Sequence, residues 1–234
     1  MKEVTGIYAS AKIWTDDVED YAAVQIAMIC DQPAAAGSQI RVMPDVHPGK
    51  VGPIGLTMTV GEKILPQLLG VDIGCGVLCA VLKEKHLEYQ KLEKVIRQKI
   101  PSGFAVREVE HHMADTIDLH RLHCFRHIRE EKAKLALGTL GGGNHFIEVD
   151  QAQNGQLYLV IHSGSRSLGK EVAEHYTMEG ARQLKARGIE VPYPMTWLEG
   201  TLMEEYVQDL QVVQEYASLN RQIMALDENI AGMK

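Results

Sequence analysis

Two strand-forming segments joined by a tight turn place the strongest constraint on how this chain folds. Residues 138–150, GTLGGGNHFIEVD, pass from a glycine-rich loop into an apolar run, and residues 156–169, QLYLVIHSGSRSLG, pass from an apolar run into a second glycine-containing loop. Between them lie Asn154 and Gly155, a dipeptide typical of β-hairpin turns. The sequence therefore predicts an antiparallel hairpin whose two polar loops meet at its open end.

The hairpin carries a histidine on each strand at that open end. His145 begins the first strand and His162 ends the second. In the register that sets them directly opposite each other, their Cβ atoms lie about 5 Å apart, close enough to share one metal ion or to bind two neighbouring ions. A shift of one residue would put them on opposite faces of the sheet. The alternative is a glycine-rich hairpin with two incidental histidines.

The same two loops contain groups that bind phosphate. Three glycines precede Asn144, and a Ser-Gly-Ser sequence precedes Arg166. Backbone N–H groups, an amide and a guanidinium at one end of a hairpin are the donors that a phosphate requires. We therefore expect Asn144 and Arg166 to bind phosphate.

A second glycine-rich stretch, residues 69–77 (LGVDIGCGV), carries Asp72 and Cys75. The glycines around them suggest a backbone that bends to aim both side chains at one point. Cysteine is a soft ligand and aspartate a hard one, so zinc, iron or manganese could accept the pair. The alternative is a buried cysteine that packs as a small hydrophobe beside a turn-forming aspartate.

Residues 44–55, PDVHPGKVGPIG, hold so many prolines and glycines that we expect an irregular loop with a fixed conformation. Asp45 and His47 are two residues apart and point to the same side if the local backbone is extended. Both are candidates to line a site. A histidine in a loop is otherwise a surface or hydrogen-bonded residue.

The remaining chain mixes short strands with longer helices and shows no regular βαβ alternation. We expect strands over residues 7–14, 39–43, 56–60 and 76–82, and helices over residues 15–30, 87–100, 109–137 and 202–230. This pattern predicts an α+β fold with mixed, largely antiparallel layered sheets and surrounding helices. No linker interrupts the glycine-rich segments, so we expect a single domain over residues 1–234.

Two of these helices raise questions of their own. In the helix expected over residues 109–137, His120, His123 and His127 would share a face, but an apolar stripe and solvated basic residues already explain that helix without a metal site. The helix expected over residues 202–230 has an apolar face, including Tyr206 and Ile223, for which we expect a partner outside the chain.

Composition narrows the function and the compartment. A net charge of −7 and a pI near 5.8 argue against a protein that coats nucleic acid with a broad basic face, so any nucleic acid must be bound locally. The four cysteines form no paired CxxC sets, which is typical of a reducing compartment. The first residues lack a signal-peptide pattern, and no long apolar run appears. We expect a cytoplasmic protein without a membrane partner.

Five segments together resemble one known family. In chain order they are MPDVHPGK, GVDIGCG, GTLGGGNHFIEV, HSGSRSLG and YASLNRQIM. This order and spacing closely resemble the RtcB family of RNA ligases over nearly the whole chain. The resemblance implies an enzyme of tRNA splicing or RNA repair that joins an RNA 3′-phosphate or 2′,3′-cyclic phosphate to a 5′-hydroxyl, with GTP and manganese. An activating protein is a further candidate partner.

The resemblance also assigns roles to single residues. It implies two Mn(II) ions bridged by Cys75, with Asp72 and His145 on the first ion and His162 on the second. Asn144 and Arg166 match positions that contact the guanylate or RNA phosphates. Ligand softness alone would favour zinc for these residues.

The sequence departs from the family in length, because family members run well beyond 234 residues. In the family, the covalent guanylate forms on a histidine of a C-terminal part that also supplies a guanine pocket and a third metal-binding histidine. Here His175 is the only histidine after His162, and its surroundings do not match, so we expect the guanylated histidine beyond Lys234. Three hypotheses follow: the N-terminal portion of a ligase, inactive alone; a metal- and phosphate-binding remnant; or a dinuclear metal phosphoesterase.

Overall fold

The computed structural model describes residues 2–83 and 86–227. The chain divides into two compact units, Met1–Gly70 with Ala173–Tyr206, and Val71–Val172 with Val207–Lys234. Each unit combines helices with a small sheet, which confirms the predicted α+β class. The single domain over residues 1–234 stays a prediction.

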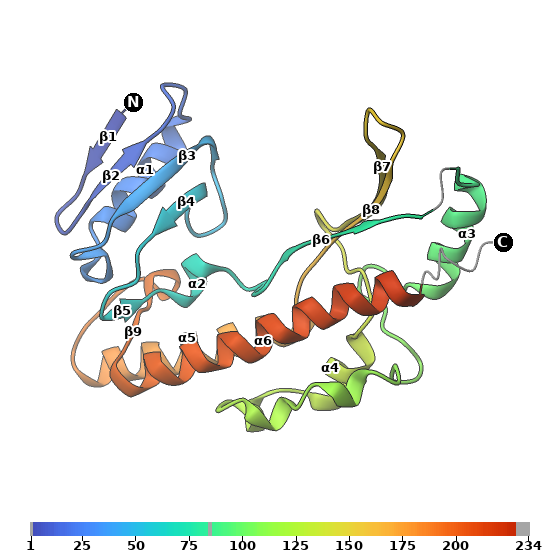
Figure 1. The fold of residues 1–234 in the computed structure, drawn as a ribbon. Helices are drawn as coiled ribbons and strands as arrows, with labels where there is room; N and C mark the ends of the chain where they lie inside the picture. Colours follow the sequence, from blue (N-terminus) through green and yellow to red (C-terminus); the bar gives the residue numbers. More distant parts are fainter. Residues whose placement is uncertain (1, 84–85, 228–234) are drawn as a thin grey trace. The chain divides into compact units, whose positions relative to one another are not determined.

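The first unit contains a sheet of four strands in the order β1-β2-β3-β4 (Figure 1). The pair β2–β3 is parallel, and the other neighbours are antiparallel. The bounds are β1 Lys2–Thr5, β2 Ser10–Ile13, β3 Ile40–His47 and β4 Ile54–Met58. A two-stranded sheet of β5 (Lys63–Ile64) and β9 (Leu198–Glu199) completes the sheets of this unit.

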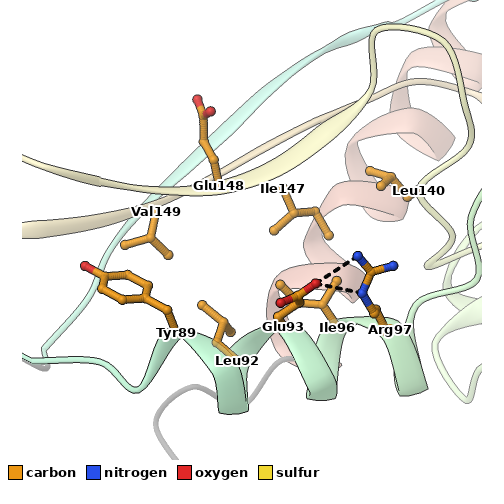
Figure 2. A pocket seen from close by; sticks show the side chains of 9 residues that line it. All are labelled: Tyr89, Leu92, Glu93, Ile96, Arg97, Leu140, Ile147, Glu148 and Val149. Atoms are coloured by element: carbon orange, nitrogen blue, oxygen red, sulfur yellow. Dashed lines mark hydrogen bonds and ion pairs between the residues drawn. The ribbon is translucent and has the colours of Figure 1, made fainter.

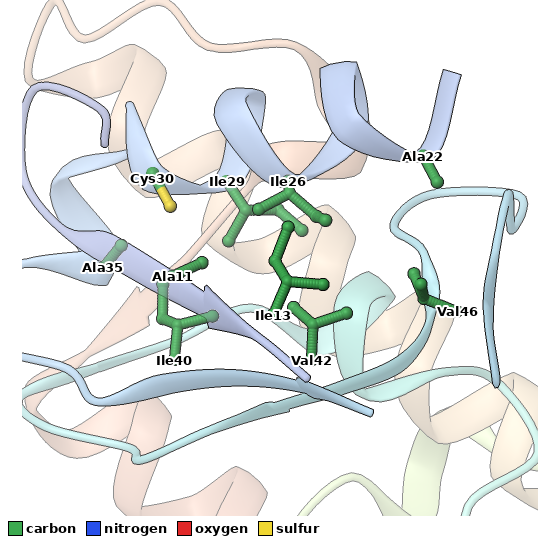
Figure 3. Packing of buried hydrophobic residues seen from close by; sticks show 10 residues of the cluster. All are labelled: Ala11, Ile13, Ala22, Ile26, Ile29, Cys30, Ala35, Ile40, Val42 and Val46. Atoms are coloured by element: carbon green, nitrogen blue, oxygen red, sulfur yellow. The ribbon is translucent and has the colours of Figure 1, made fainter. Parts of the chain in front are cut away.

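Helix α1 (Asp20–Cys30) covers one face of the four-stranded sheet (Figure 3). Its buried side chains Ile26 and Ile29 pack against Ile13 and Val42 of the sheet, within a cluster of wholly buried aliphatic residues. The helix begins at Asp20, five residues later than the sequence indicated, and the Glu19 side chain makes no capping hydrogen bond. Burial of its apolar face is therefore what stabilises this helix.

The loop expected over residues 44–55 is partly strand. Strand β3 continues through Asp45 to His47, and β4 already begins at Ile54. The pairing of β3 with β4 shifts between Val42 and His47, so Pro44 lies in an irregular part of the ladder. A bulge tolerates proline because its missing N–H removes no ladder hydrogen bond there. The density of proline and glycine predicted the irregularity but not the strand.

The second unit is built on a three-stranded antiparallel sheet in the order β6-β8-β7. Its strands are β6 (Gly76–Val81), β7 (Phe146–Gln151) and β8 (Leu157–Ser163). The predicted hairpin of β7 and β8 is confirmed: the turn between them is closed by the Ala152 N–H, which donates to the Gln156 carbonyl at 2.9 Å. Alternate residues of β8 are buried, so one face of this sheet forms the core.

Helix α3 (Tyr89–Lys99) packs on that buried face, as its amphipathic sequence predicted. Leu92 joins Leu159, Ile161 and Met224 in the core of this unit. Between α3 and β7 remains a mainly apolar pocket of about 390 Å³, bordered by Ile147 and by the Glu93–Arg97 ion pair (Figure 2).

The long helix expected over residues 109–137 does not form. The segment consists of three 3₁₀ turns followed by the short helix α4 (Glu130–Ala136). The buried carboxylate of Asp209 accepts hydrogen bonds from the backbone N–H groups of His123 at 2.7 Å and Cys124 at 3.1 Å. Because these donors are used by a distant side chain, they are not part of a helical ladder, and the histidines do not share a helix face.

Replacement of Asp209 by alanine is expected to lower the free energy of unfolding by about 2–4 kcal/mol, because one buried and one partly buried N–H group lose their acceptor. Urea unfolding followed by circular dichroism measures the change. Gln208→Ala is the matched control, since Gln208 is exposed and its side chain bonds the exposed His123 ring. Equal stability of the two variants would contradict the role assigned to Asp209.

Two long helices, α5 (Arg166–Ala186) and α6 (Gly200–Asp227), contribute residues to both units. The expectation that the apolar face of α6 needs a partner outside the chain is wrong for most of the face, because Tyr206, Val213 and Ile223 are wholly buried within the chain. Among the described residues, no helix is long and apolar enough to cross a membrane.

Candidate metal centre

Three side chains of the second unit that could hold a metal ion converge at the open end of the hairpin. One donor atom each from Asp72, Cys75 and His145 lie within 4.8 Å of one another. His145 Nε2 is 2.9 Å from Asp72 Oδ2 and 3.6 Å from Cys75 Sγ. Two ligand atoms that each lie about 2.0–2.3 Å from one ion are separated from each other by distances similar to those measured here. The three atoms can therefore bind one ion.

Cys75 also contacts a second histidine. His162 Nε2 is 3.1 Å from Cys75 Sγ, and the two imidazole rings are 5.4 Å apart between centroids. The thiol therefore has one imidazole at 3.1 Å and another at 3.6 Å, a position from which its sulfur can reach two ions.

The loop before β6 aims Asp72 and Cys75 at this point. The Cys75 N–H donates to the Asp72 carbonyl at 3.1 Å, which closes a turn and brings both side chains to the same end. Gly74 has φ +74, a conformation that favours glycine, and a Cβ there would lie 2.8 Å from the Ala217 side chain. The glycines of this stretch thus have the bending role that the sequence indicated.

The strand register differs by one residue from the register that would set His145 directly opposite His162. His162 pairs with Phe146, and His145 precedes β7. Because His145 lies in the loop rather than in the strand, the alternation of faces does not apply to it. Its ring reaches the same thiol as His162 despite the shift.

Backbone carbonyls orient both imidazoles. His145 Nδ1 is 2.9 Å from the Leu140 carbonyl, and His162 Nδ1 is 3.0 Å from the Asn144 carbonyl. A carbonyl only accepts hydrogen bonds, so each Nδ1 donates to its carbonyl, and this contact turns each Nε2 toward Cys75. Metal-binding histidines are commonly held in this way, with the second nitrogen donating to a carbonyl or carboxylate.

Asp72 is held on its other side. Its Oδ1 accepts the Ser165 N–H at 3.0 Å, which leaves Oδ2 directed at His145. Gly164 lies so close that a Cβ there would collide with the carboxylate. The loop that follows β8 thus fixes the Asp72 side chain, which comes from the glycine-rich stretch of residues 69–77.

Without a metal ion, the thiol is protonated at neutral pH. Partial removal of the sulfur from water and the negative charge of Asp72 raise the pKa of Cys75 to about 11. A bound cation would reverse this effect, because a metal-bound cysteine loses its proton.

The predicted phosphate-binding residues lie beside these groups. The Asn144 residue is exposed, and its carbonyl is the acceptor for His162. Arg166 has φ 56, and its guanidinium donates to Thr139 Oγ1 at 2.9 Å and to the Gly103 carbonyl at 2.8 Å. Burial lowers the pKa of Arg166. One donor of Arg166 thus binds the glycine-rich loop at Thr139, and another binds Gly103 outside that loop.

Asp45 and His47 belong to the first unit, where both are exposed on β3. His47 Nδ1 is 2.7 Å from the Asp45 carbonyl. Their role in lining a site stays a prediction.

The sequence analysis missed the residues that support the site from behind. The Leu140 carbonyl binds both the His145 ring and the Ser163 hydroxyl. Asn220 and Arg221 of α6 contact the same loops. Their place in YASLNRQIM, one of the five segments that resemble the family, is the signal that could have revealed them.

Comparisons with known proteins identify the family. The sequence pattern of the family described as "tRNA-splicing ligase RtcB" matches residues 25–125 and 117–228. The RNA-splicing ligase RtcB of Escherichia coli K12 is 29% identical over 92% of this chain and 59% of its own length. The tRNA-splicing ligase RtcB of Archaeoglobus fulgidus is 28% identical over 89% of this chain and 54% of its own length.

A third relative, the tRNA-splicing ligase RtcB of Pyrobaculum aerophilum, is 26% identical over 78% of this chain and 49% of its own length. The chain thus spans about half the length of the curated relatives it matches. Because the family pattern covers most of the sequence, the chain belongs to the RtcB family.

Proposed function

We propose that this chain is the metal- and phosphate-binding portion of an RNA ligase that joins a 3′-phosphate or 2′,3′-cyclic phosphate end to a 5′-hydroxyl end, with Mn(II) and GTP. The observation that carries the proposal is the pair of imidazoles whose Nε2 atoms face one thiol at 3.1 and 3.6 Å. Names of relatives that contain "RNA-splicing ligase" and "tRNA-splicing ligase" support the substrate class.

The donor atoms fit a pair of divalent ions. Asp72, Cys75 and His145 would hold the first ion, and Cys75 with His162 would hold the second. A metal pair, when bound, supplies positive charge that neutralises a phosphate and favours loss of a proton from an attacking hydroxyl.

Manganese is proposed although ligand softness favours zinc. A thiolate and two imidazoles suit zinc, whereas a carboxylate such as that of Asp72 also suits manganese. Affinity in a mixed ligand set does not decide the metal by itself, so coordination geometry and metal supply would select manganese here.

The residues of the chain have separate tasks in this proposal. The N–H groups of the glycine-rich loop and the Arg166 guanidinium bind and orient the RNA phosphate beside the metal ligands. The Asn144 amide adds a donor at the same end. The carbonyls of Leu140 and Asn144 keep both imidazoles in the tautomer that binds metal.

Binding of RNA ends tests the proposal. In the presence of Mn(II), we expect an oligonucleotide with a 3′-phosphate to bind at least about tenfold more tightly than the same oligonucleotide with a 3′-hydroxyl, the difference made by roughly one charge-assisted contact. Fluorescence anisotropy measures both affinities. Equal affinity for the two ends would contradict a phosphate-specific site.

Arg166→Ala is expected to weaken binding of the 3′-phosphate oligonucleotide by about tenfold or more, because one charged donor is lost. The metal content, measured by plasma mass spectrometry, should stay that of the unmodified chain. Arg126→Ala is the control, since Arg126 lies on a separate 3₁₀ turn. An unchanged affinity of Arg166→Ala for the phosphate end would remove its assigned role.

Incubation with GTP labelled at the α-phosphate tests whether this chain forms a covalent guanylate. We expect no covalent guanylate on this chain with Mn(II), because the family's nucleophilic histidine has no counterpart at His175. A labelled band would place the nucleophile within these residues. Hydrolysis of a cyclic phosphate without GTP would instead favour a dinuclear phosphoesterase.

A further inference from the structure

Two polar residues interrupt the buried face of α6 where it passes behind the metal-binding loops. Asn220 is wholly buried, and Arg221 is half-buried. Buried polar side chains are costly unless their hydrogen bonds are satisfied, so their partners reveal what they hold in place.

Asn220 joins two of the loops. Its Oδ1 accepts the N–H groups of Gly138 at 2.8 Å and Thr139 at 3.1 Å. Its Nδ2 lies 3.1 Å from Ser163 Oγ and 3.2 Å from the Gly164 carbonyl. One amide therefore links the start of the glycine-rich loop before His145 to the loop after His162.

Arg221 joins the loop before β6, which carries Cys75, to the hairpin of β7 and β8. Its Nη1 donates to the Gly74 carbonyl at 2.8 Å and to the Ser163 carbonyl at 2.7 Å. Gly74 directly precedes Cys75, and Ser163 directly follows His162. The guanidinium also packs against Gly76, where a Cβ would lie 3.6 Å from Nη2.

We infer that Arg221, supported by Asn220, is a positioning residue of the metal centre: its two hydrogen bonds fix the distance between Cys75 and His162, the pair proposed to hold the second ion. The inference rests on the proposed metal centre. Gly74 and Ser163 come from segments 89 residues apart, and the direct backbone pairing of their strands begins only at Gly76. A side-chain link at the strand end is what holds the ligands where the ladder stops.

Because Arg221 is positively charged, a positioning role and a purely electrostatic role predict opposite effects of its removal on metal binding. A guanidinium beside two ligands repels a bound cation, so a purely electrostatic account predicts that its removal would strengthen metal binding. Positioning predicts the opposite, because outer residues that orient ligands are worth about 10–100-fold in metal affinity.

Cobalt(II) titration of the full chain tests the inference. Cobalt absorbs according to its ligand geometry and shows a thiolate charge-transfer band, so the spectrum reports how Cys75 coordinates. We expect Arg221→Gln to bind Co(II) about 10–100-fold more weakly than the unmodified chain, with a changed spectrum. Arg221→Lys keeps the charge but not the two-carbonyl geometry, and it should show the same direction of change.

Gln222→Ala is the matched control, since Gln222 is exposed, directly follows Arg221 and bonds Ser218 on the same helix. Thermal unfolding of the metal-free proteins measures any loss of stability separately. If Arg221→Gln only loses stability, while its folded form binds Co(II) with the original affinity and spectrum, the inference is overturned. If Arg221→Gln does not fold, the spectrum and affinity of Arg221→Lys decide in the same way. Failure of the unmodified chain to bind Co(II) would instead overturn the proposed metal centre itself.

Discussion

Cys75→Ser is expected to lose both metal ions and to reduce metal affinity by more than about 100-fold, because the one side chain near both histidines loses its sulfur. Removal of this ligand acts on both proposed ions at once. Metal content after dialysis, measured by plasma mass spectrometry, gives the result. The fold should remain, since Cys75 is exposed and lies outside the hydrophobic core clusters.

Cys79→Ser is a close control for this variant. Cys79 is also an exposed cysteine without a disulfide partner, four residues further on in β6. It should keep the full metal content. Full metal content in Cys75→Ser would remove the bridging role of Cys75, whereas equal loss in both variants would point to a general effect of thiol removal.

Gly164→Ala is expected to displace the Asp72 carboxylate and to lower metal affinity by about 10–100-fold, the range typical of lost ligand orientation. The added methyl group would occupy the place of the carboxylate oxygens, so either the side chain or the loop must move. Isothermal titration with Mn(II) measures the effect. Unlike Cys75→Ser, this variant changes no proposed ligand, so it tests the geometry of the site rather than its composition.

The control is Gly142→Ala in the neighbouring glycine-rich loop. A Cβ there would meet its closest atom, Gly103 Cα, at 3.7 Å, which is ordinary van der Waals contact. Mn(II) affinity should therefore be unchanged. Loss of affinity in Gly142→Ala but not in Gly164→Ala would contradict the described packing around Asp72.

Local sequence signals predicted the hairpin but not its register. The Asn154-Gly155 turn and the alternation in β8 are encoded within a few residues, so they could be recognised directly. The pairing of His162 with Phe146 depends on how the turn is closed, which the sequence does not specify uniquely. His145 still reaches Cys75 because it precedes the strand.

The long helix predicted over residues 109–137 is wrong, because helical periodicity does not register hydrogen bonds to side chains far along the chain. The Asp209 carboxylate that binds the His123 N–H lies 86 residues further along the chain. Such a contact is visible only in the folded structure, and it converts a helix-like pattern into 3₁₀ turns.

The proposed metal ligands have clearer sequence signals than the residues that support them. Cys75, His145 and His162 have chemistry that is rare outside sites, and glycines mark their loops. Asn220 and Arg221 lie in YASLNRQIM, a segment that resembles the family but does not show which groups these two residues bind. Their bonds to Gly138, Gly74 and Ser163 follow from packing, so only the structure could connect them to the site.

The most direct test is a crystal of the chain grown with Mn(II) and measured at the manganese absorption edge. The account predicts two anomalous peaks, one bound by Asp72, Cys75 and His145 and the other by Cys75 and His162. Peaks only at other residues, with these side chains free of metal, would contradict the central claim that Cys75 and its neighbours form the metal centre.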